Sequence, residues 1–291
     1  MALNTAVFKT RALSALVFVA LMLLGLLWNF WSFFVLFSVI HFGCWYEYQR
    51  IITRVYPPYG NIPVFHRYGV MVAGWCIMLF FTGPSYSILG LPLHTIGYWL
   101  GLVSLLILPL GAAVFSGRPD LVAIRYSLLG LLYISLSWGL LVFMRSNYFG
   151  GFVNIGKWLV LLIIASIWIN DTMAYIVGSL IGKTPLTRIS PKKTWEGTLG
   201  GILLSVATLL VAAYMITEPI DAISILPWGI IAAIAAIAGT FGDLLESKLK
   251  RMADIKDSGA ILPGHGGFLD RFDSLLLATP FVWIYVVLFL K

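Results

Sequence analysis

Long apolar runs fill most of this 291-residue sequence, and they leave few folds open to it. Hydrophobic residues make up 60% of the chain and charged residues only 11%, whereas soluble domains carry about 25% charged residues. A soluble globule of this length could not bury so much apolar surface. The sequence therefore predicts an all-α polytopic membrane protein, whose helices of roughly 20 residues each cross a lipid bilayer.

The first apolar run extends from Ala12 to about Trp45. It is too long for the hydrophobic region of a cleavable signal peptide, which is about 7–15 residues, and it suits two spans. Trp28, Asn29 and Trp31 mark the expected turn, because tryptophan favours the membrane interface. Further spans are expected near 68–87, 97–115, 126–144, 157–181, 198–216, 226–246 and 274–290, which makes nine in all.

Basic residues are divided very unequally between the two sides of these spans. With the N-terminus in the cytoplasm, 16 of the 19 lysines and arginines fall on the cytoplasmic side, and only Arg145, Lys157 and Lys291 fall on the other. This positive-inside pattern predicts a cytoplasmic N-terminus. It also explains the net charge of +7, so we expect no nucleic-acid partner.

Polar features concentrate in the second half of the chain. We divide it into residues 1–150, with about five spans, and residues 151–291, with about four spans and the polar cytoplasmic connections. The second part is expected to be catalytic. Cys44 and Cys76 each lie in an apolar run and lack the paired spacing of a zinc site, so we expect two buried thiols.

Two polar features precede the most charged stretch. Asp171 lies inside an apolar run, where a carboxylate is costly unless it is paired, hydrated or bound to metal; the alternative is a structural hydrogen-bonding residue. The connection from Lys183 to Gly197 carries four cations. A helix beginning near Ser190-Pro191 would attract phosphate, although a loop that only sets topology would carry the same charges.

Charged residues cluster most densely between Asp243 and Asp273, with apolar runs on both sides. If the preceding span continues as a helix, Asp243, Ser247, Lys250 and Asp254 share one face. An ordinary solvated helix end with ion pairs would look similar up to this point.

A glycine-rich segment, Ile261–Gly267, follows within this stretch. Glycines let backbone N–H groups approach a phosphate closely, and His265 could donate to a phosphate or orient a carboxylate. Asp270 and Asp273 then share a face of the last span. Carboxylates beside cations are what a Mg²⁺–triphosphate site requires, so the stretch suggests phosphoryl or nucleotidyl transfer at the membrane surface.

From Ser247 to Asp273 the sequence reads S-x-x-K-R-x-x-x-x-K-D-x-x-x-x-x-P-G-H-G-G-x-x-D-R-x-D. This pattern resembles the signature of the CDP-diacylglycerol synthases, also called phosphatidate cytidylyltransferases. The region from Asn170-Asp171 to Glu196-Gly197 resembles the family's other motif region. Glu47, at the end of the second span, also resembles a glutamate of this family in its position.

The resemblance implies that the chain transfers CMP from CTP to phosphatidic acid, giving CDP-diacylglycerol and pyrophosphate. It implies Mg²⁺ dependence, with K⁺ associated with the metal site. Asp243 and Asp270 would be the metal carboxylates, and Asp273, Asp171 and Ser247 would support the site. The residues expected to hold the phosphates and CTP are Ser190, Lys192, Lys193, Lys250, Arg251, Lys256, His265, Gly266, Gly267 and Arg271.

Two other functions are compatible with parts of this pattern. A CTP-dependent polyprenol or phytol kinase would share the spans and acids but transfer the γ-phosphoryl group. A transporter would need polar groups across the depth of the bilayer, whereas here they gather on one side. We expect an integral protein of a bacterial cytoplasmic (inner) membrane with its site facing the cytoplasm, and we allow for a homodimer.

Overall fold

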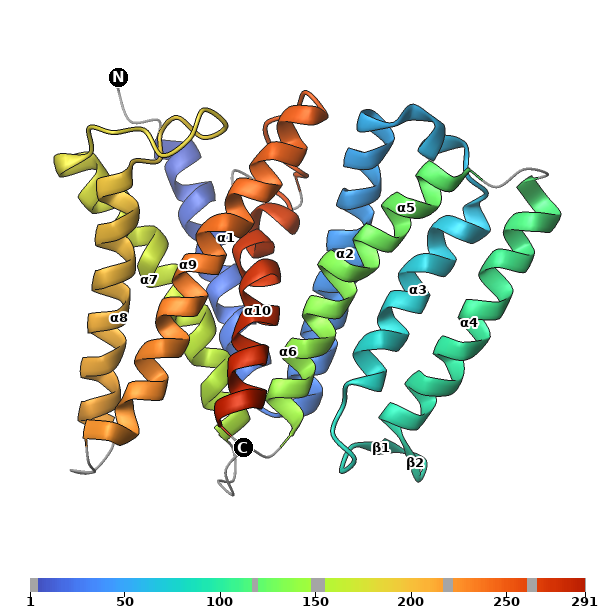
Figure 1. Cartoon of the computed structure of the whole chain (residues 1–291), viewed down its shortest axis with the longest axis horizontal. Helices are drawn as coiled ribbons and strands as arrows, with labels where there is room; N and C mark the ends of the chain where they lie inside the picture. Colours follow the sequence, from blue (N-terminus) through green and yellow to red (C-terminus); the bar gives the residue numbers. More distant parts are fainter. Residues whose placement is uncertain (1–4, 117–119, 148–154, 217–221, 261–265, 291) are drawn as a thin grey trace. The chain divides into compact units, whose positions relative to one another are not determined.

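The computed structural model describes residues 5–116, 120–147, 155–216, 222–260 and 266–290, and most of them lie in helices (Figure 1). A helical segment overlaps each of the nine predicted spans, so the all-α architecture is confirmed. The helix at the span expected near 68–87 runs from Val64 to Phe80, earlier in the chain than predicted. The elements are α1 (Thr5–Leu27), α2 (Phe30–Val55), η1 (Pro57–Asn61), α3 (Val64–Phe80), β1 (Ser87–Ile88), β2 (Leu91–Pro92), α4 (Leu93–Ser116), α5 (Leu121–Gly130), η2 (Leu131–Leu136), α6 (Ser137–Ser146), α7 (Ile155–Ile181), α8 (Trp195–Ile216), α9 (Ala222–Met252) and α10 (Leu269–Phe289).

Six helical segments among the described residues are long and apolar enough to cross a membrane. They are Leu93–Gly111, Leu121–Ser146, Ile155–Ile181, Trp195–Met215, Ile225–Met252 and Leu269–Phe289, and shorter apolar helices cover Leu16–Leu27 and Val64–Phe80. Helix α2 has 26 residues, but it buries the polar side chains of His41, Glu47 and Gln49. The chain is therefore a polytopic membrane protein, and α2 is a long helix that buries several polar groups.

The chain forms two compact units. The first unit contains Met1–Asn147 and Leu249–Phe272, and the second contains Tyr148–Lys248 and Asp273–Lys291. Helices α9 and α10 each contribute residues to both units. The segment between them, which carries most of the charged signature, belongs to the first unit.

The turn expected at the first two tryptophans is present, because α1 ends at Leu27 and α2 begins at Phe30. Asn29 caps α2: its side chain accepts a hydrogen bond from the Ser32 backbone at 2.8 Å, and the Ser32 hydroxyl accepts one from the Asn29 backbone at 3.1 Å. This reciprocal capping box satisfies N–H groups that the first turn leaves unpaired. The long first apolar run is therefore split into two helices by its one asparagine.

Aromatic side chains form much of the core of the first unit. The ring of Trp138 lies 5.1 Å from that of Phe37 and 5.6 Å from that of Phe272, between ring centroids. Edge and tilted contacts of this kind stabilise buried aromatic clusters. Phe272 is 3% exposed and belongs to the first turn of α10. The start of α10 is therefore anchored in this core.

Close helix contacts in both units rely on glycine. In the first unit, α3 and α4 lie side by side (Figure 1), and a Cβ on Gly97 would lie 2.7 Å from the Leu79 side chain. In the second unit, a Cβ on Gly201 of α8 would lie 2.7 Å from the Asn170 carbonyl oxygen of α7. Removing the side chain lets the backbones approach closely, which is how helices associate in membranes.

Single cysteines test the predicted topology. Ser190→Cys and Asp254→Cys should react with a membrane-impermeant maleimide only after the membrane is opened, whereas Glu218→Cys should react in intact cells. Asp254 is exposed and Ser258 is 5% exposed, which makes Asp254 the better position in its segment. Cys44 and Cys76 are buried, so their background should be small. Labelling of Asp254→Cys in intact cells would overturn the cytoplasmic N-terminus.

Candidate active site

The residues predicted to form the site divide between the two units. The first unit holds Lys250, Arg251, Lys256, Gly266, Gly267, Asp270 and Arg271, and the second holds Asp171, Ser190, Lys192, Lys193, Asp243, Ser247 and Asp273. His265 lies outside the described residues. Each group is described separately below.

Glu47 is the centre of the cluster in the first unit. It extends from α2, is 1% exposed, and accepts hydrogen bonds from Phe268 N and Leu269 N, both at 2.9 Å. Its carboxylate also accepts from the Ser258 hydroxyl at 2.7 Å. These N–H groups belong to the start of α10, where a negative charge is stabilised by the helix dipole. Glu47 therefore caps α10 from a helix more than two hundred residues away in sequence.

Asp270 lies beside this cap and is held by three donors. It accepts from Lys250 Nζ at 2.6 Å, from Gly267 N at 2.8 Å and from Ser258 N at 2.9 Å. The Asp270 N–H in turn donates to the Ser258 hydroxyl at 3.3 Å. Charge-assisted bonds to several donors fix the position of a carboxylate. Ser258 links the two acids, because it donates to Glu47 and exchanges bonds with Asp270.

Three glycines are required around these carboxylates. Gly266 has φ +82°, a conformation that favours glycine. A Cβ on Gly266 would lie 2.6 Å from an Asp270 carboxylate oxygen, and a Cβ on Gly259 or Gly267 would collide with the Glu47 carboxylate. These three glycines thus let protein carboxylates approach the backbone of the loop closely.

Several predicted cations of the first unit are exposed, in contrast to Lys250. The Lys250 side chain is 14% exposed, whereas Arg251, Lys256 and Arg271 are exposed residues. Arg251 Nη1 donates to the Ile255 carbonyl oxygen at 3.4 Å. The signature thus supplies one cation to the buried carboxylate network and three to the surface.

Asp243 is the centre of the cluster in the second unit. It forms an ion pair with Lys193, and Ser247, one turn further along α9, donates its hydroxyl hydrogen bond to Asp243 at 3.3 Å. The side chains of Lys193 and Asp243 are 27% and 30% exposed, so the pair is partly open to solvent. The predicted neighbours on one face of the helix, Asp243 and Ser247, are therefore in contact.

Three carboxylates of the second unit lie close together. One oxygen each of Asp243, Glu246 and Asp273 lies within 4.8 Å of the other two. Gly242 permits this approach, because a Cβ there would lie 3.0 Å from the Cα of Ser274 in α10. Oxygen-only donors are the ligands that Mg²⁺ prefers. The residues present therefore fit a divalent cation, whereas the expected pairing of Asp243 with Asp270 on one metal stays a prediction.

Asp171 belongs to the polar surroundings of the same cluster. It interacts electrostatically with Lys193 and with Asp243. Its neighbour Asn170, which is 2% exposed, donates at 3.4 Å to Asp171 and at 3.4 Å to the Thr240 hydroxyl on α9. The carboxylate inside the sixth predicted span, which is α7, thus lies beside polar groups of α7 and α9.

The loop between α7 and α8 is held in a hairpin-like shape that positions Lys193. Leu186 N donates to the Lys193 carbonyl oxygen at 2.7 Å, and Trp195 N donates to the Thr184 carbonyl oxygen at 2.9 Å. Glu196, in the first turn of α8, accepts from the Thr184 hydroxyl at 2.8 Å and from Lys183 N at 3.2 Å. Both ends of the loop are therefore tied together next to the lysine.

Three residues of these clusters were absent from the predicted site: Glu47, Glu246 and Ser258. The signal for Glu246 was present, because it stands three residues after Asp243 and shares its helix face. Glu47 was noted only for its similarity to the family, and its partners could not be inferred from spacing. Ser258 occupies a position where the signature accepts any residue.

Comparison with known proteins gives matches along nearly the whole chain. A sequence model of the cytidylyltransferase family matches residues 9–289. "Phosphatidate cytidylyltransferase" of Bacillus subtilis (strain 168) is 46% identical over 124 residues, which are 42% of this chain and 45% of the relative. "Phosphatidate cytidylyltransferase" of Rickettsia bellii (strain RML369-C) is 39% identical over 173 residues, 58% of this chain and 72% of the relative. "Phosphatidate cytidylyltransferase 4, chloroplastic" of Arabidopsis thaliana is 40% identical over 122 residues, which are 42% of this chain and 30% of the relative. The matched segments thus cover less than half of the Bacillus and Arabidopsis relatives.

Proposed function

We propose, because this chain belongs to the cytidylyltransferase family, that it transfers CMP from CTP to phosphatidic acid. A phosphate oxygen of phosphatidic acid bonds to the α-phosphorus of CTP, and the bond from that phosphorus to the oxygen bridging the α- and β-phosphates breaks. The products are CDP-diacylglycerol and pyrophosphate. Because the lipid phosphate is itself the nucleophile, the protein's task is to position both substrates and to neutralise charge.

The observation that carries this proposal is the carboxylate cluster of the second unit, with Lys193 paired to Asp243. Asp243, Glu246 and Asp273 would hold Mg²⁺, which supplies charge neutralisation for the triphosphate when bound. Lys193 offers a cation to phosphate oxygens, and Asp171 and Ser247 maintain the polar surroundings. K⁺ as a second cation remains part of the proposal.

The first unit would contribute the phosphate contacts of the signature. Asp270 and Lys250 form a fixed pair, and Asp270 holds the N–H groups of Gly267 and Ser258. Arg251, Lys256 and Arg271 are exposed and present cations to a nucleotide. Preorganised groups of this kind are effective because they need no rearrangement when charge moves between phosphates.

The lipid substrate and the positive-inside count together suggest where the reaction occurs. Phosphatidic acid lies in the bilayer and CTP is cytoplasmic, so we place the reaction at the cytoplasmic face of a bacterial inner membrane. A homodimer is compatible with this arrangement.

The direct test uses purified full-length protein, phosphatidic acid in detergent micelles, Mg²⁺ and CTP labelled at the α-phosphate. We expect label to enter the lipid fraction and unlabelled pyrophosphate to be released. Label that remains in soluble CDP, with phosphate added to a polyprenol or phytol acceptor, would indicate the kinase instead. Removing Mg²⁺ with a chelator should abolish the transfer.

Glu196→Ala tests whether the α7–α8 loop positions Lys193. The variant loses the acceptor that ties Lys183 and Thr184 to α8, so we expect kcat/KM to fall by about tenfold, as for residues that hold a ligand in place. Thr187→Ala is the matched control, because it removes a local bond to Ile189 N in the same loop. Equal activity of the two variants at equal thermal stability would exclude this role for Glu196.

A further inference from the structure

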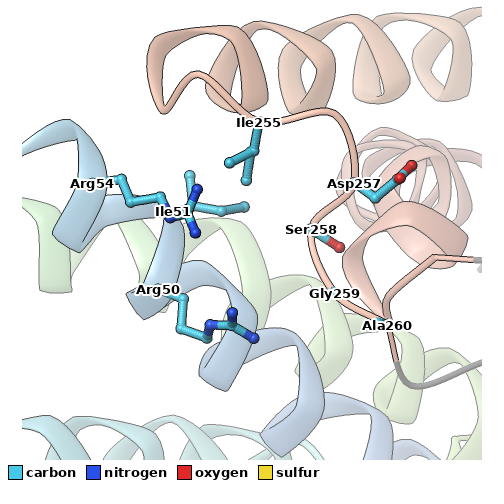
Figure 2. A pocket seen from close by; sticks show the side chains of 8 residues that line it. All are labelled: Arg50, Ile51, Arg54, Ile255, Asp257, Ser258, Gly259 and Ala260. Atoms are coloured by element: carbon cyan, nitrogen blue, oxygen red, sulfur yellow. The ribbon is translucent and has the colours of Figure 1, made fainter.

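A pocket of about 230 Å³ opens in the first unit beside the signature loop (Figure 2). Its walls come from two segments far apart in sequence, α2 and the segment that follows α9. The lining residues are Arg50, Ile51, Arg54, Ile255, Asp257, Ser258, Gly259 and Ala260. Ile51 is buried beside the arginines on α2, and Ser258 is buried across from them, on the side that we call the floor (Figure 2). The two arginines are exposed. The pocket is therefore bounded by α2 with its two cations on one side and by the Ser258 segment on the other.

Arg50 and Arg54 stand four residues apart on one face of α2. Like charges at this spacing destabilise a helix unless an anion lies between them. Among the ion pairs of the described residues, none involves either arginine. The one acid that lines the pocket is Asp257, and in Figure 2 its carboxylate points away from both guanidinium groups. The two cations thus face the pocket without an acidic partner from the described part of the chain.

The floor of the pocket is tied to the carboxylate network of the candidate site. Ser258 donates its hydroxyl hydrogen bond to Glu47 at 2.7 Å and its N–H to Asp270 at 2.9 Å. Glu47 lies three residues before Arg50 on the same helix, so the wall carrying the arginines and the floor are joined by a buried hydrogen bond. Anything bound by the arginines would therefore lie next to the residues that hold Asp270.

We propose that this pocket binds a phosphate group through Arg50 and Arg54. Guanidinium groups recognise phosphate through paired hydrogen bonds, and two of them suit a multiply charged group. The choice of ligand rests on the proposed function, which offers two sources: the terminal phosphates of the nucleotide, released as pyrophosphate, and the headgroup of phosphatidic acid. Neither arginine belongs to the signature, so the pocket adds a contact from the N-terminal half of the chain.

The test compares Arg50→Gln, Arg54→Gln and the double variant with the wild-type protein, all full length and in detergent. Arg125→Gln is the matched control. Like Arg50, Arg125 is exposed and lies over a tyrosine ring. Its Cζ atom is 5.7 Å from the ring centroid of Tyr126, and the Cζ atom of Arg50 is 5.8 Å from that of Tyr46. Arg125 does not line the pocket. Binding of inorganic pyrophosphate is measured by calorimetry, and KM is measured separately for CTP and for phosphatidic acid.

We expect each single substitution to weaken phosphate binding about tenfold and the double variant to weaken it more, because each removes a charge-assisted contact. Weaker pyrophosphate binding together with a raised KM for CTP assigns the pocket to the nucleotide. A raised KM for phosphatidic acid alone assigns it to the lipid headgroup. Arg125→Gln should behave as the wild type in every assay.

The outcomes separate this proposal from the proposed function. If the wild type transfers CMP and the double variant keeps wild-type pyrophosphate binding and both KM values, the phosphate pocket is wrong and the function stands. If the wild type transfers no CMP but binds pyrophosphate, and the Arg50→Gln and Arg54→Gln variants bind it more weakly, the proposed function is wrong and the pocket stands.

Discussion

Asp270→Asn should lower CMP transfer by more than about 100-fold, while the protein still folds and inserts into the membrane. Residues that only orient a metal ligand typically cost about 10–100-fold. Asp270 fixes Lys250 and two loop N–H groups at once, so its loss should cost more. Asparagine keeps one acceptor for the Ser258 and Gly267 N–H groups, but its amide would face Lys250 Nζ, where the carboxylate oxygen is 2.6 Å away. The measurement is label transfer from CTP into lipid at several Mg²⁺ concentrations.

Two comparisons make this result specific. Asp254→Asn removes an exposed charge from the same stretch, at a position with φ +52° that asparagine also adopts, and it should retain activity. Raising Mg²⁺ should restore Asp273→Asn in part, because that variant weakens one of the three carboxylates proposed to hold the metal. It should restore Asp270→Asn very little, because Asp270 orders Lys250 and two loop N–H groups instead. Near-normal turnover of a well-folded Asp270→Asn protein would show that Asp270 is dispensable for transfer.

Glu47→Gln should both destabilise the first unit and lower activity. The carboxylate accepts from Phe268 N, Leu269 N and the Ser258 hydroxyl, and it is 1% exposed. A glutamine amide would place a donor against one of these donors, and hydrogen bonds to a buried charged group are worth about 1.5–3 kcal/mol each. We therefore expect the thermal midpoint in detergent to fall by several degrees and transfer to fall by at least about tenfold, because α10 carries Asp270.

Thr53→Ala is the control for that prediction. It removes a local hydrogen bond within the same helix, which the Thr53 hydroxyl donates to the Gln49 carbonyl oxygen at 2.8 Å. It should leave both the midpoint and the transfer rate unchanged. A Glu47→Gln protein that melts and turns over as Thr53→Ala does would mean that the cap on α10 is dispensable.

The helices could be predicted because their signals are local. Apolar runs of the length of a bilayer predicted helices that overlap the observed ones, and the Trp28–Asn29 turn followed from one polar residue between two such runs. The contact between Asp243 and Ser247 also follows from helical periodicity, because residues four apart share a face. Composition likewise predicted the burial of both cysteines.

The partners of buried polar groups could not be predicted in this way. Ser258 stands in a charged stretch and reads as an exposed loop residue, yet it is 5% exposed and bonded to Glu47, 211 residues earlier. A buried carboxylate must find donors, but spacing does not say which part of the chain supplies them.

The sequence by itself determined where apolar helices form and which polar residues it concentrates, because hydropathy and periodicity act over a few turns of helix. Tertiary structure alone decided that Glu47 caps α10, that Asp273 joins Asp243 and Glu246, and that Arg50 and Arg54 face the Ser258–Gly259 segment. The first two depend on close approaches at glycines, of the Glu47 carboxylate to Gly259 and Gly267 and of Gly242 to Ser274. The free energy of satisfying buried charges selects among such approaches only when the whole chain is packed.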